Sequence, residues 1–323
     1  MKKTLYNFAE CSLFLFLMAL SVILSVTKRF QSAIIDGVSL WYACILPTVF
    51  PFAVITAITS ALSVTSKISN VLSPFTTRIF KVNGAVGYAF FLNVLSGYPM
   101  GAKLIGELKE KGAISQTESV RASVLCSSSS PTFLIASVGG IMFNSVKFGL
   151  CLFCCHLVAL IVTGFIFSFY NRKDKPTLNN NAPLKKIDNL FYESVFSSTL
   201  ATLTVGGIIV VFYLLTEVLL YFGLLTPVVS FFSVFLGKQN GRAFALGIFE
   251  CTKGLKALAL GGFSALSLPI ACFLTSFGGI SVIMQSVAFL KRAKIKIAPF
   301  LLSKVCSAIL SFVLGFVCYF ICY

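Results

Sequence analysis

The sequence predicts an all-α integral membrane protein of about seven spans, with re-entrant or broken helices and two inverted-topology repeats. Three observations support this prediction. Apolar residues make up 57% of the 323 residues and charged residues only 11%, whereas soluble domains carry about 25% charged residues. The mean hydropathy is correspondingly high, at +0.94. Finally, Ser, Gly and Pro interrupt several apolar runs, and these interruptions recur at matching places in the two halves of the chain.

The first two spans lie before the first interruption. Ser12–Val26 is long enough to remain as an anchor, and no small-residue cleavage site follows it, so we expect no cleavable signal. Trp41–Leu62 is the second span, and its Pro47 and Pro51 predict a kink. The segment 64–82 has mixed polarity and is expected to lie along the membrane interface.

Breaks in the apolar pattern mark the next segments. Gly84–Leu108 contains the first break, and Glu107–Arg121 reads as a charged helix or turn at the surface. The stretch 122–143 carries a serine-rich break, and Phe148–Tyr170 is an uninterrupted span. Beyond a polar linker with five basic residues, further apolar segments occupy 197–222, 224–236, 243–262, 265–290 and 299–322.

These segments divide the chain into an anchor and two repeats. The expected boundaries are an N-terminal anchor span (1–37), a first repeat (38–170), a basic cytoplasmic linker (171–191) and a second repeat (192–323). Cys155–Phe165 matches Cys306–Phe316 in its Cys, Gly and Phe. At nearly the same offset, the break at 97–103 falls over 249–254, and the serine-rich break falls over 276–281. Paired breaks of this kind are the best sequence-level indication of a transport site.

The formal net charge of +16 comes from short basic clusters between apolar runs. Such clusters are typical of loops on the cytoplasmic side of a membrane. The sequence shows no basic face with interleaved aromatic residues, so we expect the protein to contact membrane lipid and not to bind nucleic acid. With the N-terminus and the linker in the cytoplasm, most basic residues fall on that side. The basic residues left outside are Lys28, Arg29, Lys147, Lys238, Arg242, Lys253 and Lys256.

Most of the eleven cysteines lie inside apolar segments, where Cys acts as a small hydrophobe. Cys151, Cys154, Cys155 and His156 look like a ligand cluster. Cys-x-x-Cys on a helix is nevertheless an ordinary core spacing, and no second ligand pair is apparent elsewhere. We therefore expect no metal and no cofactor. The sole histidine, His156, either relays protons or, as we favour, is a hydrogen-bonded structural residue.

The serine-rich break has the pattern of a half-helix that begins inside the membrane. Ser130 reads as an N-cap and Pro131 as the first helical position, so the positive end of the helix faces the preceding serines. Tyr98-Pro99 begins a second half-helix in the same way. The alternative is that these small residues only let helices pack closely. In the second half, the matching element is the Gly278-Gly279 pair, which reads equally well as a simple kink.

Charged residues beside the breaks are the other candidates. An ionisable group near the bilayer centre costs at least ~2.5–3.5 kcal/mol, so one that enters the membrane is normally functional. The alternative for Lys103 and Lys256 is that their long side chains extend to the membrane interface and have no role in binding. Glu250 either pairs with Lys253 or carries a coupling proton, and the coupling ion is left open. The candidate substrate-binding residues are Ser96, Gly97, Tyr98, Pro99, Lys103, Ser127, Ser128, Ser129, Ser130, Thr132, Glu250, Thr252, Lys253, Gly278, Gly279, Ser281 and Gln285.

No catalytic motif stands in the chain: it has no Ser/His/Asp set, phosphate-binding loop or His-Glu-x-x-His. The sequence therefore predicts a carrier for a small anion and not an enzyme. A nucleoside or ion carrier and a non-transporting membrane scaffold remain the alternatives.

Several motifs resemble the sporulation integral membrane protein family YlbJ, within the nucleoside-recognition or Gate superfamily. They are Leu46–Phe52, Ser96–Lys103, Ser128–Pro131, Phe249–Gly254 and Phe277–Gln285. The resemblance implies that the two repeats are Gate-like, in an architecture similar to concentrative nucleoside transporters. It also implies a role in endospore formation, with dipicolinate moved across the outer forespore membrane. Many members have Asn where this chain has Cys126 and Ser127. The scaffold alternative would then serve spore-envelope assembly.

Overall fold

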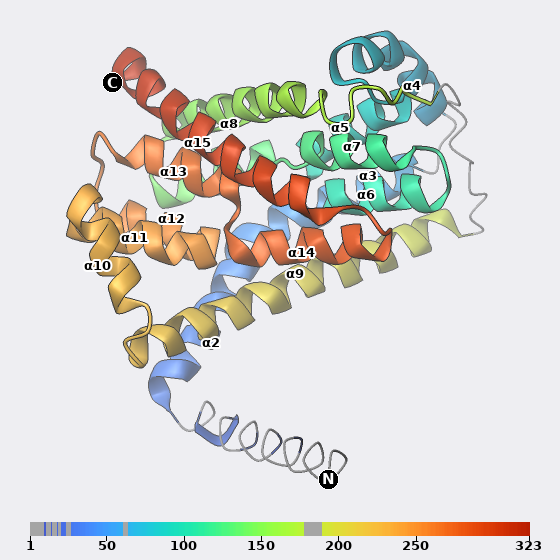
Figure 1. Ribbon diagram of the computed structural model, residues 1–323. Helices are drawn as coiled ribbons and strands as arrows, with labels where there is room; N and C mark the ends of the chain where they lie inside the picture. Colours follow the sequence, from blue (N-terminus) through green and yellow to red (C-terminus); the bar gives the residue numbers. More distant parts are fainter. Residues whose placement is uncertain are drawn as a thin grey trace, which may run out of the picture.

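The computed structural model describes residues 27–60, 64–177 and 189–323, together with isolated positions before residue 27. The predicted anchor span Ser12–Val26 and the centre of the linker lie outside these residues. Every regular element of the described chain is helical, and the long helices α8, α9 and α15 cross the molecule (Figure 1). The predicted all-α membrane class is confirmed by these helices and by their apolar composition.

The first half is built from short helices that lead to one long helix. In order they are α2 (Lys28–Leu40), the π-helix η1 (Trp41–Ile45), α3 (Leu46–Ser60), α4 (Val64–Phe75), the π-helix η2 (Thr76–Phe80), α5 (Gly84–Ser96), α6 (Met100–Glu110), α7 (Gln116–Leu125), the π-helix η3 (Thr132–Met142) and α8 (Val146–Phe167). The predicted kink in the second span is present, because the helices over 28–45 and 49–59 meet at 54°.

The second half has a similar order of elements. They are α9 (Leu190–Tyr221), α10 (Thr226–Leu236), α11 (Lys238–Phe249), α12 (Cys251–Leu260), α13 (Ser267–Phe277), α14 (Gly279–Arg292) and α15 (Ile297–Cys322). Helices α11 and α12 form an antiparallel hairpin. An added Cβ at Gly254 would meet Gly247, and one at Gly261 would meet Gln239, at the other end of the pair. The tip of this hairpin is Glu250.

Within the described residues, four helices are long and apolar enough to cross a membrane, and this number rises to six if each bent pair counts as one span. The four are Val146–Phe167, Leu190–Tyr221, Ser267–Arg292 and Ile297–Cys322. The bent pairs are 28–59 and 67–96, the second with an angle of 96°. The predicted total of seven includes the first span, which the structure does not describe, so that total stays a prediction.

The packing between the halves is reciprocal. Helix α6 packs on α14 and α12 packs on η3, while α7 packs on α15 and α13 packs on α8. Helices α8 and α15 run in opposite directions. Lys147, at the start of α8, donates to the carbonyl of Cys322 at the end of α15 (2.5 Å). This arrangement is the one expected of an inverted duplication, and the duplication itself remains a prediction.

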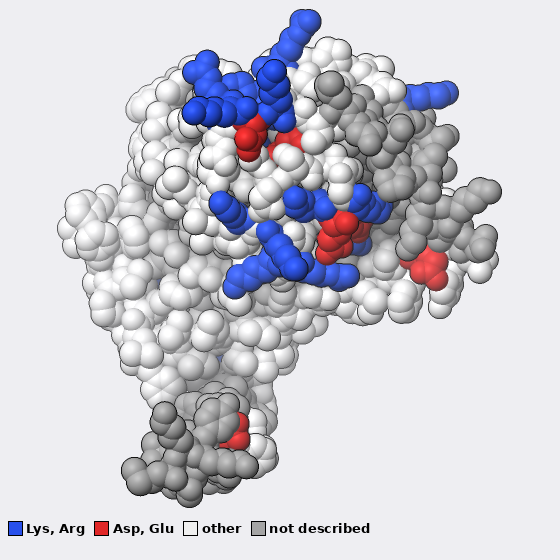
Figure 2. All heavy atoms as spheres, turned by 45° about the vertical axis from the view of Figure 1, so that its right-hand side comes forward, with Lys and Arg blue, Asp and Glu red and all other residues white. Residues whose placement is uncertain are grey.

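One side of the molecule carries most of the exposed positive charge. Figure 2 shows Lys and Arg side chains gathered on the side where α6 and α14 end. Arg292 and Glu110 join these two helix ends by a salt bridge of 3.5 Å. The exposed residues there include Lys111, Arg172, Lys173, Lys175, Lys291, Lys294 and Lys296. These residues belong to the set that the sequence predicts to face the cytoplasm, and the structure places them on one side of the molecule.

The prediction of a surface-like segment at 107–121 is wrong at its C-terminal end. Glu118 and Arg121 are 0% and 2% exposed. Glu118 accepts hydrogen bonds from the backbone N–H groups of Asn83, Ser115 and Thr177. Arg121 donates to the carbonyls of Lys81, Tyr170, Asn171 and Asp174. These two charges are buried because they satisfy backbone groups that fix the start of the linker on α7.

Candidate functional site

Four interruptions of the helices meet around one small cavity of about 60 Å³ in the interior. They are the α5–α6 link (97–99), the extended segment 126–130 between α7 and η3, the α11–α12 tip at Glu250, and Gly278 between α13 and α14. The cavity is lined by Ser96, Gly97, Tyr98, Ser129, Ser130, Glu250, Thr252, Gly278 and Gln285, all predicted site residues. Its apolar lining comes from Ile45, Val49, Phe133, Val205, Ile209 and Val282.

The first interruption follows from Gly97. Helix α5 ends at Ser96, and Gly97 has φ +77° and ψ −169°, a conformation accessible essentially to glycine alone. An added Cβ at Gly97 would lie 2.7 Å from the backbone nitrogen of Ser130. The two breaks of the first half therefore touch, and a larger residue at Gly97 would push them apart. The Ser96 hydroxyl donates to the carbonyl of Leu92 (2.6 Å), which fixes it at the cavity edge.

His156 ties the serine-rich segment to the second half. The Ser129 N–H donates to His156 Nε2 (3.0 Å), so Nε2 is the unprotonated nitrogen. The proton is then on Nδ1, which lies 2.8 Å from Ser276 Oγ and donates to it. Ser128 lies within 3.3 Å of Nε2 and donates to the carbonyl of Ser129. This network matches the favoured interpretation of a hydrogen-bonded structural histidine, although it joins the two halves.

Ser130 acts as a helix cap at the cavity. Its hydroxyl accepts from the N–H of Phe133 (3.3 Å) and bonds to Thr132 (3.2 Å). Helix η3 thus begins at the cavity, as Ser130-Pro131 predicts, and its positive end faces Ser127–Ser130. Thr132 is half-buried and does not line the cavity.

In the second half, Glu250 caps α12. Its carboxylate, 1% exposed, accepts from the backbone N–H of Lys253 (2.6 Å) and from the Thr252 hydroxyl. The Lys253 ammonium turns away to Thr216 Oγ1 (2.7 Å) and to the carboxylate of Glu217 (3.3 Å). The predicted Glu250–Lys253 side-chain pair is therefore replaced by a helix cap, and Glu217, which also binds Arg29, is the partner of Lys253.

Two glycines with positive φ form the other interruption. Gly278 and Gly279 have φ of +85° and +73°. An added Cβ at Gly279 would lie 2.9 Å from the backbone nitrogen of Cys251 and 3.0 Å from the carbonyl oxygen of Gly247. This break therefore touches the hairpin tip, as Gly97 touches Ser130 in the first half. One turn further, the buried Ser281 hydroxyl has no protein partner, and Gln285 lines the cavity.

Lys304, on α15, is the cation beside this cavity, and the sequence analysis did not select it. Its side chain is 2% exposed, and its ammonium donates to Tyr98 Oη (2.6 Å) and Ser127 Oγ (3.2 Å). The ammonium also lies 3.8 Å from the position that a Cβ of Gly278 would take. None of the salt bridges in the described chain involves Lys304. A single Lys inside a long apolar helix was the available signal.

The remaining predicted residues lie near the cavity without lining it, or away from it. Ser127 and Ser128 are buried beside it, in contact with Lys304 and His156. Lys103 is half-buried on α6 and does not line the cavity. Lys253 lines a second cavity of about 330 Å³, with Asp36, Arg242 and Lys256. Pro99 follows a cis peptide bond at the start of α6, and Gly279 and Ser281 are buried in α14.

A small cavity at the meeting point of broken helices, together with the long apolar helices, is typical of a polytopic helical integral membrane protein. The chain is 27% identical over 325 residues to the sporulation integral membrane protein YlbJ of Bacillus subtilis (strain 168), covering 92% of this chain and 79% of that protein. This similarity supports the resemblance to the YlbJ family seen in the motifs. No protein-family model matches the chain, and no solved structure matches it.

Proposed function

We propose that this protein carries a small anionic metabolite across a membrane by alternating access at the paired broken helices. The observation that carries the proposal is Lys304. It is a buried ammonium at a cavity edge, with two neutral hydroxyls as hydrogen-bond partners. A buried charge without a countercharge is expensive, and an anion in the cavity would supply that countercharge. An ammonium has three N–H donors, so one remains for the anion.

The rest of the site fits the same cargo. Helix η3 begins at the cavity, and hydroxyls of Ser129 and Ser130 lie beside its positive end. The apolar residues Phe133, Val205 and Ile209 offer a surface for a flat ring. Dipicolinate is a planar dianion with an aromatic ring, so it has the negative charge and the flat ring that these two surfaces would accept. The name of the B. subtilis relative concerns sporulation, which favours dipicolinate and the outer forespore membrane over other anions and membranes.

The cavity in this conformation holds only a few water molecules, since one water needs about 10–15 Å³. Passage of the anion therefore requires the breaks to separate on one side or the other. Gly97 lets the first-half breaks touch, and Gly279 lets the second-half breaks touch. These two contacts are the ones that must open.

The test uses purified full-length protein in liposomes loaded with labelled dipicolinate. We expect Lys304→Met to reduce transport at least tenfold and Lys304→Arg to retain part of it, because the anion needs a positive charge there. Lys296→Met is the matched control, since Lys296 is an exposed lysine just before the same helix. Normal flux through Lys304→Met would refute the site.

Two further outcomes separate the alternatives. Inhibition by nucleosides and not by unlabelled dipicolinate would favour a nucleoside carrier. No flux of either compound, together with a sporulation defect that added dipicolinate does not rescue, would favour a membrane scaffold. The buried Lys304 favours the anion carrier, because a scaffold has no use for an unpaired internal cation.

A further inference from the structure

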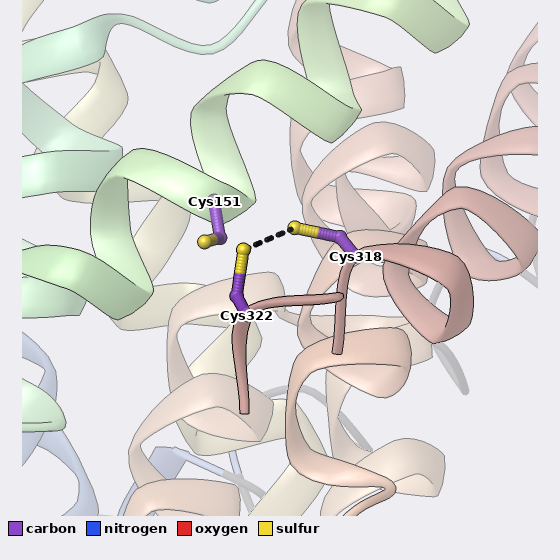
Figure 3. A group of neighbouring side chains, drawn as sticks. All are labelled: Cys151, Cys318 and Cys322. Carbon is purple, nitrogen blue, oxygen red and sulfur yellow. Dashed lines mark hydrogen bonds between the residues drawn. The ribbon is translucent and has the colours of Figure 1, made fainter. Parts of the chain in front are cut away.

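Three thiols gather far from the transport cavity, where α8 begins and α15 ends. Cys151 lies in the second turn of α8, while Cys318 and Cys322 are one turn apart at the end of α15 (Figure 3). Their three sulfur atoms all lie within 4.8 Å of one another, and Cys318 Sγ and Cys322 Sγ are 3.9 Å apart. All three are free thiols and half-buried, and they lie near the ends of their helices.

The spacing suits a metal with sulfur ligands. Zn–S bonds are about 2.3 Å, which places the sulfurs of a tetrahedral or trigonal site about 3.8–4.0 Å apart. The observed separations need shifts of less than about 1 Å, within the reach of a side-chain torsion. Cys155 lies one turn further along α8. It is the candidate for a fourth ligand.

The charges around the thiols also fit a metal–thiolate group. The Lys147 ammonium, one turn before Cys151, donates to the carbonyl of Cys322 (2.5 Å) and lies 4.6 Å from the centroid of the Tyr323 ring. Its single positive charge balances the net charge of −1 that three thiolates leave with a divalent ion, and half of the −2 that they leave with a monovalent ion.

Packing alone does not account for the convergence. Cys154 is the neighbour of Cys155 in sequence, yet it is exposed and takes no part in the group. The sequence analysis found no second ligand pair for Cys151. The structure supplies one in Cys318 and Cys322, which the fold brings from the other half of the chain. His156, the other residue of the apparent sequence cluster, is committed to Ser129 and Ser276.

We propose that Cys151, Cys318 and Cys322 bind one thiophilic d¹⁰ metal ion, Zn²⁺ or Cu⁺, which joins α8 to α15. Binding forms three metal–sulfur bonds and releases three thiol protons to solvent. Soft thiolate ligands without carboxylate or imidazole select such ions over Mg²⁺, Ca²⁺ or Mn²⁺. The ion would fix the two long helices to each other, one from each half of the chain.

The test uses the reduced full-length protein in detergent, with Cd²⁺ as the spectroscopic probe. We expect one Cd²⁺ per chain, an ultraviolet thiolate-to-cadmium charge-transfer band, and displacement of Cd²⁺ by Zn²⁺ or Cu⁺. Cys151→Ser and Cys318→Ser should weaken Cd²⁺ binding roughly tenfold or more. Cys154→Ser on α8 and Cys306→Ser on α15 are the matched controls and should bind as the parent protein does.

Thermal unfolding separates loss of binding from loss of folding. Saturating Cd²⁺ should raise the Tm of the parent protein and of Cys154→Ser, and leave the Tm of Cys318→Ser unchanged. The proposal is overturned by a charge-transfer band that persists in Cys151→Ser, or by no band at all in the reduced parent protein. A disulfide among these cysteines that re-forms in the presence of Zn²⁺ would overturn it as well.

Discussion

Glu250 lines the cavity, Lys304 contacts Tyr98 beside it, and the hydrogen-bond partners of each charge decide what it does. Glu250 is held by the first N–H groups of α12, whereas Lys304 is held by hydroxyls alone. An anion beside Lys304 also lies near the Glu250 carboxylate, which lines the same cavity. Protonation of Glu250 removes that repulsion, so Glu250 is where a proton would assist anion binding.

This gives a pH prediction. Dipicolinate transport by the parent protein should rise as pH falls, because protonated Glu250 no longer repels the dianion. Glu250→Gln keeps a carbonyl oxygen for the N–H of Lys253 and should show a smaller rise in transport as pH falls than the parent protein does. Flux measured in liposomes over a range of pH checks this, with Glu193→Gln at an exposed site as the control. An unchanged pH profile in Glu250→Gln would remove Glu250 from proton coupling.

Arg121 gives a prediction about stability. Its guanidinium donates to four backbone carbonyls in a buried setting, so Arg121→Met leaves those carbonyls unpaired. We expect a loss of roughly 3 kcal/mol in the free energy of unfolding. Arg292→Met is the control, because Arg292 is 79% exposed and its salt bridge to Glu110 is at the surface. Thermal unfolding in detergent should show a clear fall in Tm for Arg121→Met only.

At the scale of elements, each half has a hairpin whose tip touches a break in the next helix. Gly97 contacts Ser130, and Gly279 contacts Cys251. The helices themselves are ordinary apolar segments, and glycine allows their ends to meet at the cavity. A side chain at either contact would separate the tip from the break while leaving the helices intact.

Gly279→Ala tests this contact. Ala at positive φ costs about 1–2 kcal/mol, and the added Cβ would also press on the backbone of Cys251. Gly262→Ala is a matched control, because Gly262 has φ +82° and nothing within 4 Å of the added Cβ. We expect both variants to lose some stability and only Gly279→Ala to lose transport as well. Equal transport in the two variants would show that the contact is not needed.

The sequence predicted most breaks because Ser, Gly and Pro within an apolar run directly favour the end or the start of a helix. The interruptions at Gly97, Ser127–Ser130, Glu250 and Gly278 all appear where they were expected. It did not predict which charges face the cavity, because proximity to a break does not determine the direction of a side chain. Lys103 and Lys253 are next to breaks and do not line the cavity, while Lys304, on a distant helix, donates to Tyr98, which does line it.

At the scale of the whole molecule, the basic face gives a prediction of orientation. The turn at Lys294 lies on that face, beside the start of α7, since the Gln116 side chain donates to the Lys294 carbonyl (3.1 Å). The turn at Gly262 lies between α12 and α13. The start of α13 packs on the C-terminal part of α15, where an added Cβ at Gly315 would lie 2.8 Å from Pro269. The positive-inside rule then places Lys294 in the cytoplasm and Gly262 outside.

An epitope inserted at each turn checks this orientation. Antibody should reach the tag at Gly262 in intact protoplasts, and the tag at Lys294 only after permeabilisation. A tag at Lys173, in the linker on the basic face, should behave as the tag at Lys294 does. The reverse pattern would contradict the predicted orientation and leave the cavity and its residues unaffected.

The two halves resemble each other in their helices but differ in their charges. Lys304 on α15 contacts Tyr98 and Ser127, whereas His156 on α8 contacts Ser129 and Ser276. In the matched register of the two halves, His156 corresponds to Ser307 and Lys304 corresponds to Phe153, so neither group has a counterpart in the other half. As the carrier that we propose, the protein would have two end states of unequal energy, so it would rest with one gate shut and its affinity for cargo would differ between the two compartments.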